Sequence, residues 1–286
     1  MIEYKQYISL QKEYIKRKIN EFLTEDMVND DVTTNNTIKN HNIITAEIYA
    51  LEKLIFVGSQ ILPHFFNSKC QFKCYKKDGE NVMPNEKIGK IIGPANIILS
   101  VERVMLNLIQ RLSGIATMTQ DYIQILNNNN IKILDTRKTT PGLRLFEKHA
   151  VALGGGYNHR LDLSKGILIK DNHIIAAGSI TDAITLIKKN NLNLPIEIEI
   201  DNLYQLKEAL TMSINGVLLD NMSISNIIKA VEIIRNNKNN SQIFIEASGG
   251  ITKKNLQSFV NTGVNGLSIG AITHSAISKD IKLEFI

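Results

Sequence analysis

The chain has 286 residues, of which 43% are hydrophobic and 21% charged, proportions that are ordinary for a globular protein of one large or two modest domains. Only two cysteines are present, which excludes a framework of disulfides. The net charge of +5 favours anionic partners, but it is mild for this length and aromatic residues make up only 6%, so nucleic-acid binding is not expected.

The first 25 residues show helical spacing of apolar side chains, for example at Tyr7, Tyr14 and Ile15, and predict a helix over 1–25. This stretch is charged throughout and lacks the apolar core of a signal peptide. No apolar run in the chain reaches the roughly 18 residues of a membrane span. We therefore predict a cytoplasmic protein with no membrane partner.

Residues 43–99 read as short strands separated by turns such as Asp78-Gly79. A long helix is predicted next, over Val101–Leu126, because its apolar residues repeat at helical spacing. Two styles of sequence meet near residue 112, and this helix is predicted to link the two parts of the chain.

From residue 131 onward, strands and helices alternate. Short apolar runs predict six strands at Ile131–Leu134, Gly166–Ile169, Ile196–Ile200, Gly216–Leu219, Ile243–Ile245 and Gly266–Ile269. Helical patterns fill most of the gaps, at Thr181–Lys189, Leu203–Leu210, Ile224–Ile234 and Asn255–Thr262. This alternation favours parallel βα units with right-handed crossovers. Two asparagine-rich runs, at 127–130 and 236–240, predict loops or helix ends.

Polar or glycine residues directly follow each predicted strand. They are Asp135-Thr136-Arg137-Lys138, Lys170-Asp171-Asn172-His173, Asp201-Asn202, Asp220-Asn221, Ala247-Ser248-Gly249-Gly250 and Gly270-Ala271. Functional groups at the carboxyl ends of every parallel strand are typical of the active face of a βα barrel. A doubly wound open sheet is the structural alternative, but it would concentrate function at one switch point.

Two segments supply candidate anion-binding cations. Arg137 and Lys138 form an adjacent pair that can grip an anion, although a solvated loop is the alternative. In the second segment, the three glycines of 154–156 allow the backbone to approach a ligand, and His159 and Arg160 then add donors. His159 alone would more often be structural.

Carboxylates and small residues complete the candidate site. In the strand Ile196–Ile200, strict alternation puts Glu197 and Glu199 on one face, which in a barrel points inward and requires cationic, metal or hydroxyl partners. An edge strand with a solvated face is the alternative. The loops at 248–250 and 270–271 follow the last two strands, where βα barrels often bind phosphate. A multiply anionic substrate, a phosphorylated substrate and a divalent metal would suit this set.

At these residues the sequence resembles the quinolinate phosphoribosyltransferase family. The matching text is ERVMLN (102–107), RLSGIAT (111–117), LDTRKTTPGLR (134–144), GGGYNHRLDL (154–163), LIKDNHI (168–174), LLDNMS (218–223), EASGGI (246–251) and SIGAITHSA (268–276). These motifs run in order over about residues 22–285. The sequence departs from the family pattern at Val28 and Asp30, where glycines are usual.

The resemblance implies an α/β fold with an N-terminal, sandwich-like α/β domain at 1–112, joined by a C-terminal segment at 277–286. It also implies a parallel βα barrel of fewer than eight strands at 113–276. The oligomer implied is a homodimer with shared active sites, a higher oligomer being left open.

The resemblance also assigns residues to two substrates. The quinolinate site would be formed by Arg103 from the partner subunit and by Thr136, Arg137, Lys138, His159, Arg160 and Lys170. Phosphoribosyl pyrophosphate would contact Lys138, Glu199, Asp220, Ser248, Gly249, Gly250, Gly270, Ala271 and His274. Catalysis would involve Lys138, Glu199 and Asp220, and the last two would hold Mg²⁺, directly or through water.

The implied activity is phosphoribosyl transfer to quinolinate with decarboxylation, which gives nicotinate mononucleotide, carbon dioxide and pyrophosphate for de novo NAD biosynthesis. The alternative is a homologous phosphoribosyltransferase with another acceptor, either nicotinate or the substrate of a molybdenum-associated relative.

Overall fold

The structure, a computed structural model, describes residues 2–38, 42–190, 192–237 and 241–286. The chain divides into two compact units, each built from segments far apart in the sequence. The first unit comprises Met1–Gln6, Asp121–Arg144 and Gly156–His274. The second comprises Tyr7–Gln120, Leu145–Gly155 and Ser275–Ile286.

A six-stranded parallel sheet forms the first unit, in the order β6-β11-β10-β9-β8-β7. Its strands are β6 (Lys132–Leu134), β7 (Ile167–Ile169), β8 (Ile196–Ile200), β9 (Gly216–Asp220), β10 (Phe244–Ser248) and β11 (Gly266–Ser268). From β7 to β11 consecutive strands are neighbours, and β11 returns to β6, which is the order of a partial βα barrel with its seam between β6 and β7. The six predicted strands and the predicted fold class are confirmed.

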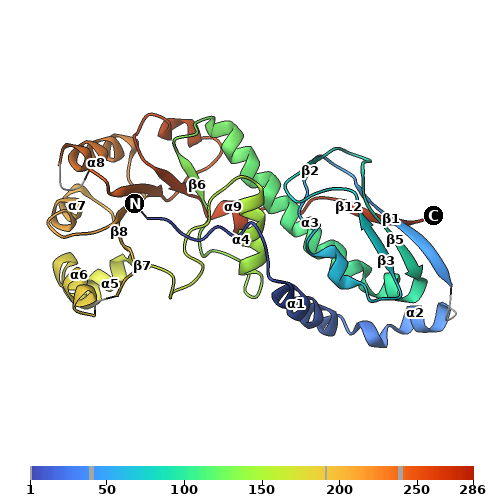
Figure 1. The fold of residues 1–286 in the computed structure, drawn as a ribbon. Helices are drawn as coiled ribbons and strands as arrows, with labels where there is room; N and C mark the ends of the chain where they lie inside the picture. The colour runs from blue at the N-terminus through green and yellow to red at the C-terminus, as the bar shows by residue number, and fades with distance from the viewer. Residues whose placement is uncertain (1, 39–41, 191, 238–240) are drawn as a thin grey trace. The chain divides into compact units, whose positions relative to one another are not determined.

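Helices connect these strands. They are α5 (Asp171–Ala177), α6 (Ile180–Lys189), α7 (Leu203–Ala209), α8 (Ile224–Asn236), the 3₁₀ helix η3 (Leu256–Phe259) and α9 (Ala271–His274). Within this unit α6, α7 and α8 lie outside the strands (Figure 1). The predicted helix at Asn255–Thr262 is wrong in extent, because only the four residues of η3 are helical and Gly263, with φ of +80°, turns the chain.

The segment around Tyr157 lies along the seam side of β6. Tyr157 forms a parallel bridge with Leu134, its N–H donates to Ile133 at 2.8 Å, and its carbonyl accepts from Asp135 at 3.0 Å. These bonds place the predicted anion-binding residues His159 and Arg160 beside the end of β6.

The first residues form an extended arm rather than the start of a helix, so the predicted helix over 1–25 is wrong at its beginning. Helix α1 (Lys12–Glu25) begins only at Lys12. Ahead of it, Ile2 packs with Leu134, Phe244 and the half-buried Tyr4. A Cβ on Gly216 would lie 2.5 Å from Ile2, so the missing side chain at Gly216 makes room for the arm. Burial of these apolar side chains outweighs the helical periodicity here.

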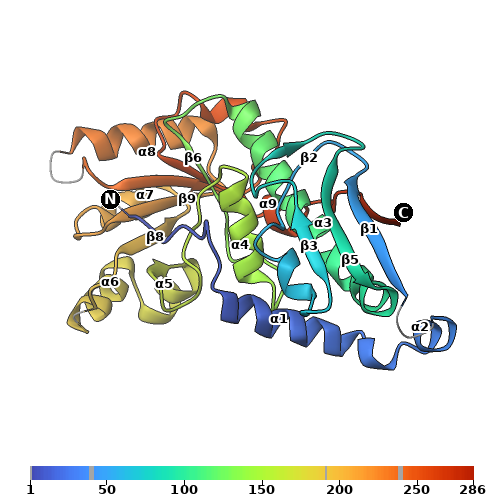
Figure 2. The ribbon, with the colours of Figure 1, turned by 45° about the vertical axis from the view of Figure 1, so that its right-hand side comes forward.

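The second unit contains an antiparallel sheet in the order β12-β1-β5-β3 and a separate pair of strands. The strands are β1 (Ile43–Ala50), β3 (Gln71–Cys74), β5 (Lys87–Pro94) and β12 (Ile281–Phe285), with β2 (Leu54–Ile55) pairing β4 (Asn81–Val82). Figure 2 shows β1, β5 and β3 side by side in this unit. The C-terminal strand β12 pairs along the whole of its length with β1.

The remaining helices are α1, η1 (Val28–Asp30), α2 (Val32–Thr37), η2 (Leu62–Phe65), α3 (Ala95–Leu126) and α4 (Arg144–Leu153). Helix α3 begins before the predicted Val101, because Pro94 directly precedes it and Ala95 and Ile98 are already buried. At the departures from the family pattern, Val28 and Asp30 both lie in η1, and the left-handed conformation falls on Met27 with φ of 51°.

The predicted loop at 127–130 follows the end of α3. Of the second asparagine-rich run, residues 238–240 lie outside the described residues. Among the described helices, none is long and apolar enough to cross a membrane.

Candidate active site

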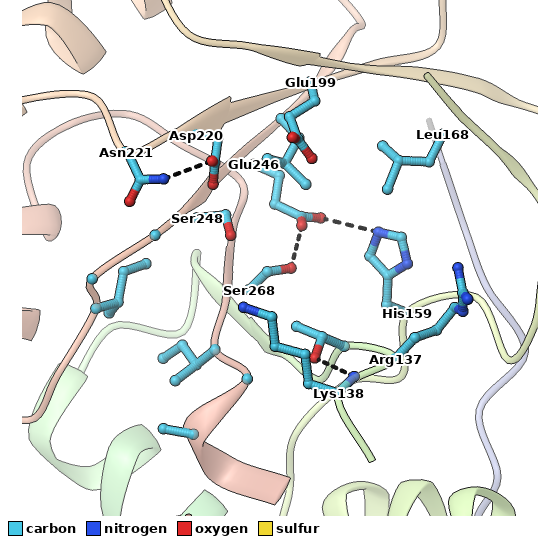
Figure 3. Close-up of a pocket in the computed structure, with 18 of the residues that line it drawn as sticks. Arg137, Lys138, His159, Leu168, Glu199, Asp220, Asn221, Glu246, Ser248 and Ser268 are labelled. Atoms are coloured by element: carbon cyan, nitrogen blue, oxygen red, sulfur yellow. Dashed lines mark hydrogen bonds and ion pairs between the residues drawn. The ribbon is translucent and has the colours of Figure 1, made fainter. Parts of the chain in front are cut away.

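A cavity of about 630 Å³ lies at the carboxyl ends of the barrel strands, within the first unit. Its lining includes most of the predicted site residues: Thr136, Arg137, Lys138, His159, Arg160, Lys170, Glu199, Asp220, Ser248, Gly249, Gly250, Gly270, Ala271 and His274. Arg103 is the exception, since it lies on α3 in the second unit and is not among the lining residues. Figure 3 shows Arg137 and Lys138 at one edge of this cavity and Glu199 and Asp220 at another.

Two arginines create a strong positive field at the first edge. Arg160 is 5% exposed and donates from Nη1 to the carbonyl of Gly166 at 2.8 Å. Burial, and then the positive charge of Arg137, lower the pKa of Arg160. The Nε of Arg137 is buried without a hydrogen-bond partner in the described chain. Two close guanidinium groups with an unsatisfied donor form an arrangement that an anionic ligand would stabilise.

Backbone contacts fix the tautomer of His159. Its Nδ1 accepts the backbone N–H of Arg160 at 2.8 Å, so the ring proton lies on Nε2. The Nε2–H group faces the Oε2 of Glu197 at 3.2 Å. Asp135, which is fully buried, accepts the backbone N–H of His159 at 2.8 Å and so orients the same residue from behind. His159 is therefore held as a neutral ring on the cavity wall.

Two buried glutamates lie next to His159: Glu246 lines the cavity, whereas Glu197 does not. Glu197 accepts from His159 and from the hydroxyl of Tyr4 at 3.3 Å, while Glu246 accepts from Ser268. Burial, and then the nearby charge of Glu197, raise the pKa of Glu246 to about 7. The sequence prediction that Glu197 points into the barrel and takes a polar partner is confirmed.

This cluster also raises the possibility of a metal site. Ligand atoms of His159, Glu197 and Glu246 lie within 4.8 Å of one another. A metal on the Nε2 of His159 would require the proton to move to Nδ1, where the N–H of Arg160 already points. The geometry therefore favours a hydrogen-bonded cluster over a metal centre.

The second edge of the cavity is acidic. Glu199 pairs with the ammonium of Lys170 at 2.7 Å. Asp220, at the end of the neighbouring strand β9, accepts from the side chain of Asn221 at 2.7 Å. Mg²⁺ is usually held by one or two carboxylates together with water and substrate phosphates. Glu199 and Asp220 fit that requirement, since carboxylate oxygens of both lie on the cavity wall.

Glycines shape the third edge, after β10 and β11. Gly249 and Gly250 have φ of 91° and 61°, in the left-handed region that favours glycine. A Cβ on Gly249 would lie 2.1 Å from the Oδ1 of Asn221, and one on Gly270 would lie 2.9 Å from the Cδ of Lys138. A Cβ on Gly250, in contrast, would meet nothing within 4 Å, so at this residue the loop leaves space for a ligand such as phosphate.

The structure adds lining residues that the sequence analysis did not select: Leu168, Leu218, Asn221, Glu246, Ile251, Thr252, Ser268 and Ile269. The positions of two of them, Glu246 and Ser268, follow from strand alternation in the sequence. Glu246 stands two residues before Ser248, and Ser268 two before Gly270, so strand alternation places each on the same inward face. The alternation that directs Glu197 and Glu199 inward thus also holds in β10 and β11.

The arginine pair, the acidic edge and the glycine loops all lie at the strand ends of a partial βα barrel, a combination that suits a site for anionic ligands. Residues 31–113 match the sequence model of the quinolinate phosphoribosyl transferase N-terminal domain, and residues 115–284 match that of the C-terminal domain. The chain therefore belongs to the quinolinate phosphoribosyltransferase family, and the resemblance is confirmed.

Similar proteins match this chain over nearly its whole length. The probable nicotinate-nucleotide pyrophosphorylase (carboxylating) of Bacillus subtilis is 43% identical over 276 residues, which covers 94% of this chain and 93% of that protein. The solved structure of the nicotinate-nucleotide pyrophosphorylase from Francisella tularensis has a TM-score of 0.92 at 34% identity, covering 99% of this chain and 100% of that chain. The Ehrlichia chaffeensis structure of the same name gives 0.90 at 39% identity, covering 97% and 100%.

Proposed function

We propose that this chain transfers a phosphoribosyl group from phosphoribosyl pyrophosphate to quinolinate and releases carbon dioxide, giving nicotinate mononucleotide for NAD biosynthesis. The observation that carries the proposal is the arginine pair, the buried Arg160 and the half-buried Arg137, in the same cavity as the glycine loop of 249–250. An acceptor with two adjacent carboxylates can use both guanidinium groups, and a phosphate can use the loop.

Catalysis in this cavity would rest on positioning and charge. The pyridine nitrogen attacks C1 of the ribose while pyrophosphate leaves, through an oxocarbenium-like state. The arginine pair and Lys138 would orient the acceptor, and Glu199 and Asp220, which line the same cavity, would hold ribose hydroxyls. Lys138 and the backbone N–H groups of the glycine loops would offset the negative charge of the leaving group.

Decarboxylation follows from the first step. Once the ring nitrogen carries the ribose, it is positively charged and stabilises the electron pair left behind when the adjacent carboxylate departs as carbon dioxide. A proton then takes the place of the carboxylate on that ring carbon. The protein's task in this step is to hold the other carboxylate in place, which the arginine pair can do.

The proposed cofactor is Mg²⁺, which would bind the pyrophosphate group of phosphoribosyl pyrophosphate. Glu199 and Asp220 would hold it directly or through water, and the ion would neutralise charge on the leaving group. The ion pair of Glu199 with Lys170 occupies one carboxylate oxygen and leaves the other available.

The proposed enzyme is a cytoplasmic homodimer with shared active sites. Arg103 would enter the cavity of the other subunit, since it is the only predicted site residue that does not line the cavity of its own chain within the described residues. The proposed domains are 1–112 with 277–286, and 113–276 as the catalytic barrel. The compact units differ from these bounds: residues 1–6 belong to the barrel unit, and residues 145–155 belong to the other unit.

The test is a product assay with purified protein, quinolinate, phosphoribosyl pyrophosphate and magnesium. We expect carbon dioxide, pyrophosphate and nicotinate mononucleotide in equal amounts, and no turnover without quinolinate. Pyrophosphate release with nicotinate but without carbon dioxide would replace the proposal by the nicotinate-transferase alternative.

A further inference from the structure

The N-terminal arm, residues 2–6, reaches the floor of the candidate active site. The arm occupies space left by glycines on the barrel strands and at their starts. A Cβ on Gly166 would lie 2.8 Å from the ring of Tyr4, and one on Gly216 would lie 2.5 Å from Ile2. A side chain at Gly166 would push the ring of Tyr4 aside, and one at Gly216 would force the end of the Ile2 side chain to move, so both glycines accommodate the arm.

Tyr4 makes two contacts with the cluster under the cavity. Its ring packs on the ring of His159, with centroids 4.6 Å apart and planes inclined by 31°. Its hydroxyl donates to the Oε2 of Glu197 at 3.3 Å, the same oxygen that receives the Nε2–H of His159. Burial, then the charges of Glu197 and Glu246, raise the pKa of Tyr4, so this hydroxyl remains a donor.

The side chain of Gln6 forms two hydrogen bonds with the backbone of Asn158, the residue before His159. Its Nε2 donates to the carbonyl of Asn158 at 3.3 Å, and its Oε1 accepts the N–H of Asn158 at 2.8 Å. This pair of bonds imitates a strand pairing and fixes the backbone of Asn158 directly before His159 and Arg160. The arm therefore contacts His159 through the ring of Tyr4, and it holds the backbone that leads to His159 and Arg160 through Gln6.

We infer that Tyr4 and Gln6 are positioning residues for the acceptor: they hold His159 and Arg160 at the angle that receives the pyridine carboxylates, without touching the substrate themselves. This inference rests on the proposed function. It also predicts that changes in the arm affect the binding of quinolinate but not of phosphoribosyl pyrophosphate. The glycine loops at 248–250 and 270 follow β10 and β11, and no described contact of Tyr4 or Gln6 reaches them.

The kinetic test compares Tyr4→Phe, Tyr4→Ala and Gln6→Ala in the full chain. We expect the KM for quinolinate to rise on the order of tenfold in Tyr4→Phe, which loses one hydrogen bond to a charged group, and further in Tyr4→Ala. The KM for phosphoribosyl pyrophosphate should stay within about twofold. The matched control is Tyr122→Phe, a buried tyrosine of the same unit that does not line the cavity.

Equal rises in both KM values, a change in thermal stability alone, or the same effect in Tyr122→Phe would overturn the inference. A failure of the proposed function is recognised separately, because wild-type protein would then not turn over quinolinate at all.

A second readout does not depend on activity. The ¹⁵N spectrum of the histidine rings, assigned with His159→Ala, should show His159 as the Nε2–H tautomer in the wild type, because Nδ1 accepts the N–H of Arg160. In Tyr4→Ala the tautomer should stay the same, but the ring resonances of His159 should shift, because the ring loses the tyrosine packed against it. A wild-type ring protonated on Nδ1, or an unchanged spectrum in Tyr4→Ala, would show that the arm does not set the orientation of His159.

Discussion

At the scale of single residues, Glu199 links the two substrate sides of the cavity. Its carboxylate holds Lys170, a predicted quinolinate residue, although Glu199 itself is assigned to the ribose and magnesium side. Removing its charge would release Lys170 for an anionic acceptor. The KM for quinolinate should therefore not rise together with the KM for phosphoribosyl pyrophosphate.

For Glu199→Gln we expect the KM for phosphoribosyl pyrophosphate to rise on the order of tenfold, and the KM for quinolinate to fall or stay unchanged. Steady-state kinetics with each substrate varied in turn measures both values. Glu232→Gln is the matched control, an identical charge change on the exposed face of α8. A parallel loss of both substrates would disprove the assignment of Glu199.

Glu246 predicts a dependence of stability on pH. Its pKa is raised to about 7 in the folded protein by burial and by Glu197, so between its ordinary value of 4.5 and about 7 the folded state binds a proton that the unfolded state lacks. Binding of this proton increases the free energy of unfolding. The increase is fully present below pH 4.5 and is lost as the pH rises to about 7.

Glu246→Gln cannot ionise and should therefore gain stability relative to the wild type as the pH rises from 5 to 7, by at most about 1.4 kcal/mol per pH unit. Urea unfolding of both proteins across this range measures the difference. A constant difference between the two proteins would mean that Glu246 is ionised in the folded state at all these pH values.

At the scale of elements, most of the barrel could be predicted from the sequence pattern of its strands. The six barrel strands, their order along the chain and the inward direction of Glu197 and Glu199 follow from apolar runs and polar strand ends. The N-terminal arm could not be predicted this way, because Tyr7, Tyr14 and Ile15 give helical spacing and nothing local shows that Ile2 and Tyr4 bury themselves in the barrel. That burial is a tertiary effect, and it overrides local propensity.

The same limit applies to the floor of the site. Tyr4 lies 193 residues before Glu197 in the chain, so their hydrogen bond has no sequence signal. The cavity wall was predictable because each residue stands at a strand end, whereas the contacts that orient His159 depend on how distant segments pack.

The loop after β10 gives a prediction at this scale. Gly249→Ala would strain a backbone with φ of 91° and would place the Cβ 2.1 Å from the Asn221 side chain, so the KM for phosphoribosyl pyrophosphate should rise more than tenfold. The matched control is Gly178→Ala, with φ of 104° but only an ordinary contact of 3.5 Å to Asp182. Both variants should lose stability, as thermal unfolding will measure. Equal kinetics in the two would show that the loop does not bind the phosphate.

At the scale of the whole molecule, the proposed sharing of sites predicts complementation. Arg103→Ala and Lys138→Ala chains should each be nearly inactive. When they are mixed and allowed to exchange subunits, about half of the dimers are mixed and each has one intact site, so about a quarter of the wild-type activity should return. No recovery after exchange has been demonstrated by mass spectrometry would contradict a shared site.

The most direct test of the central claim compares two acceptors, quinolinate and nicotinate, at saturating phosphoribosyl pyrophosphate and magnesium. The cavity holds Arg137, Arg160 and Lys170, more cations than one carboxylate can pair, so nicotinate would leave buried donors unsatisfied. A site built for a polar group rejects an analogue that lacks it by a factor of about 10⁴ in favourable cases. We predict a kcat/KM for quinolinate larger by a factor of that order, with one carbon dioxide for each nucleotide. Equal values of kcat/KM for the two acids would contradict the dicarboxylate site.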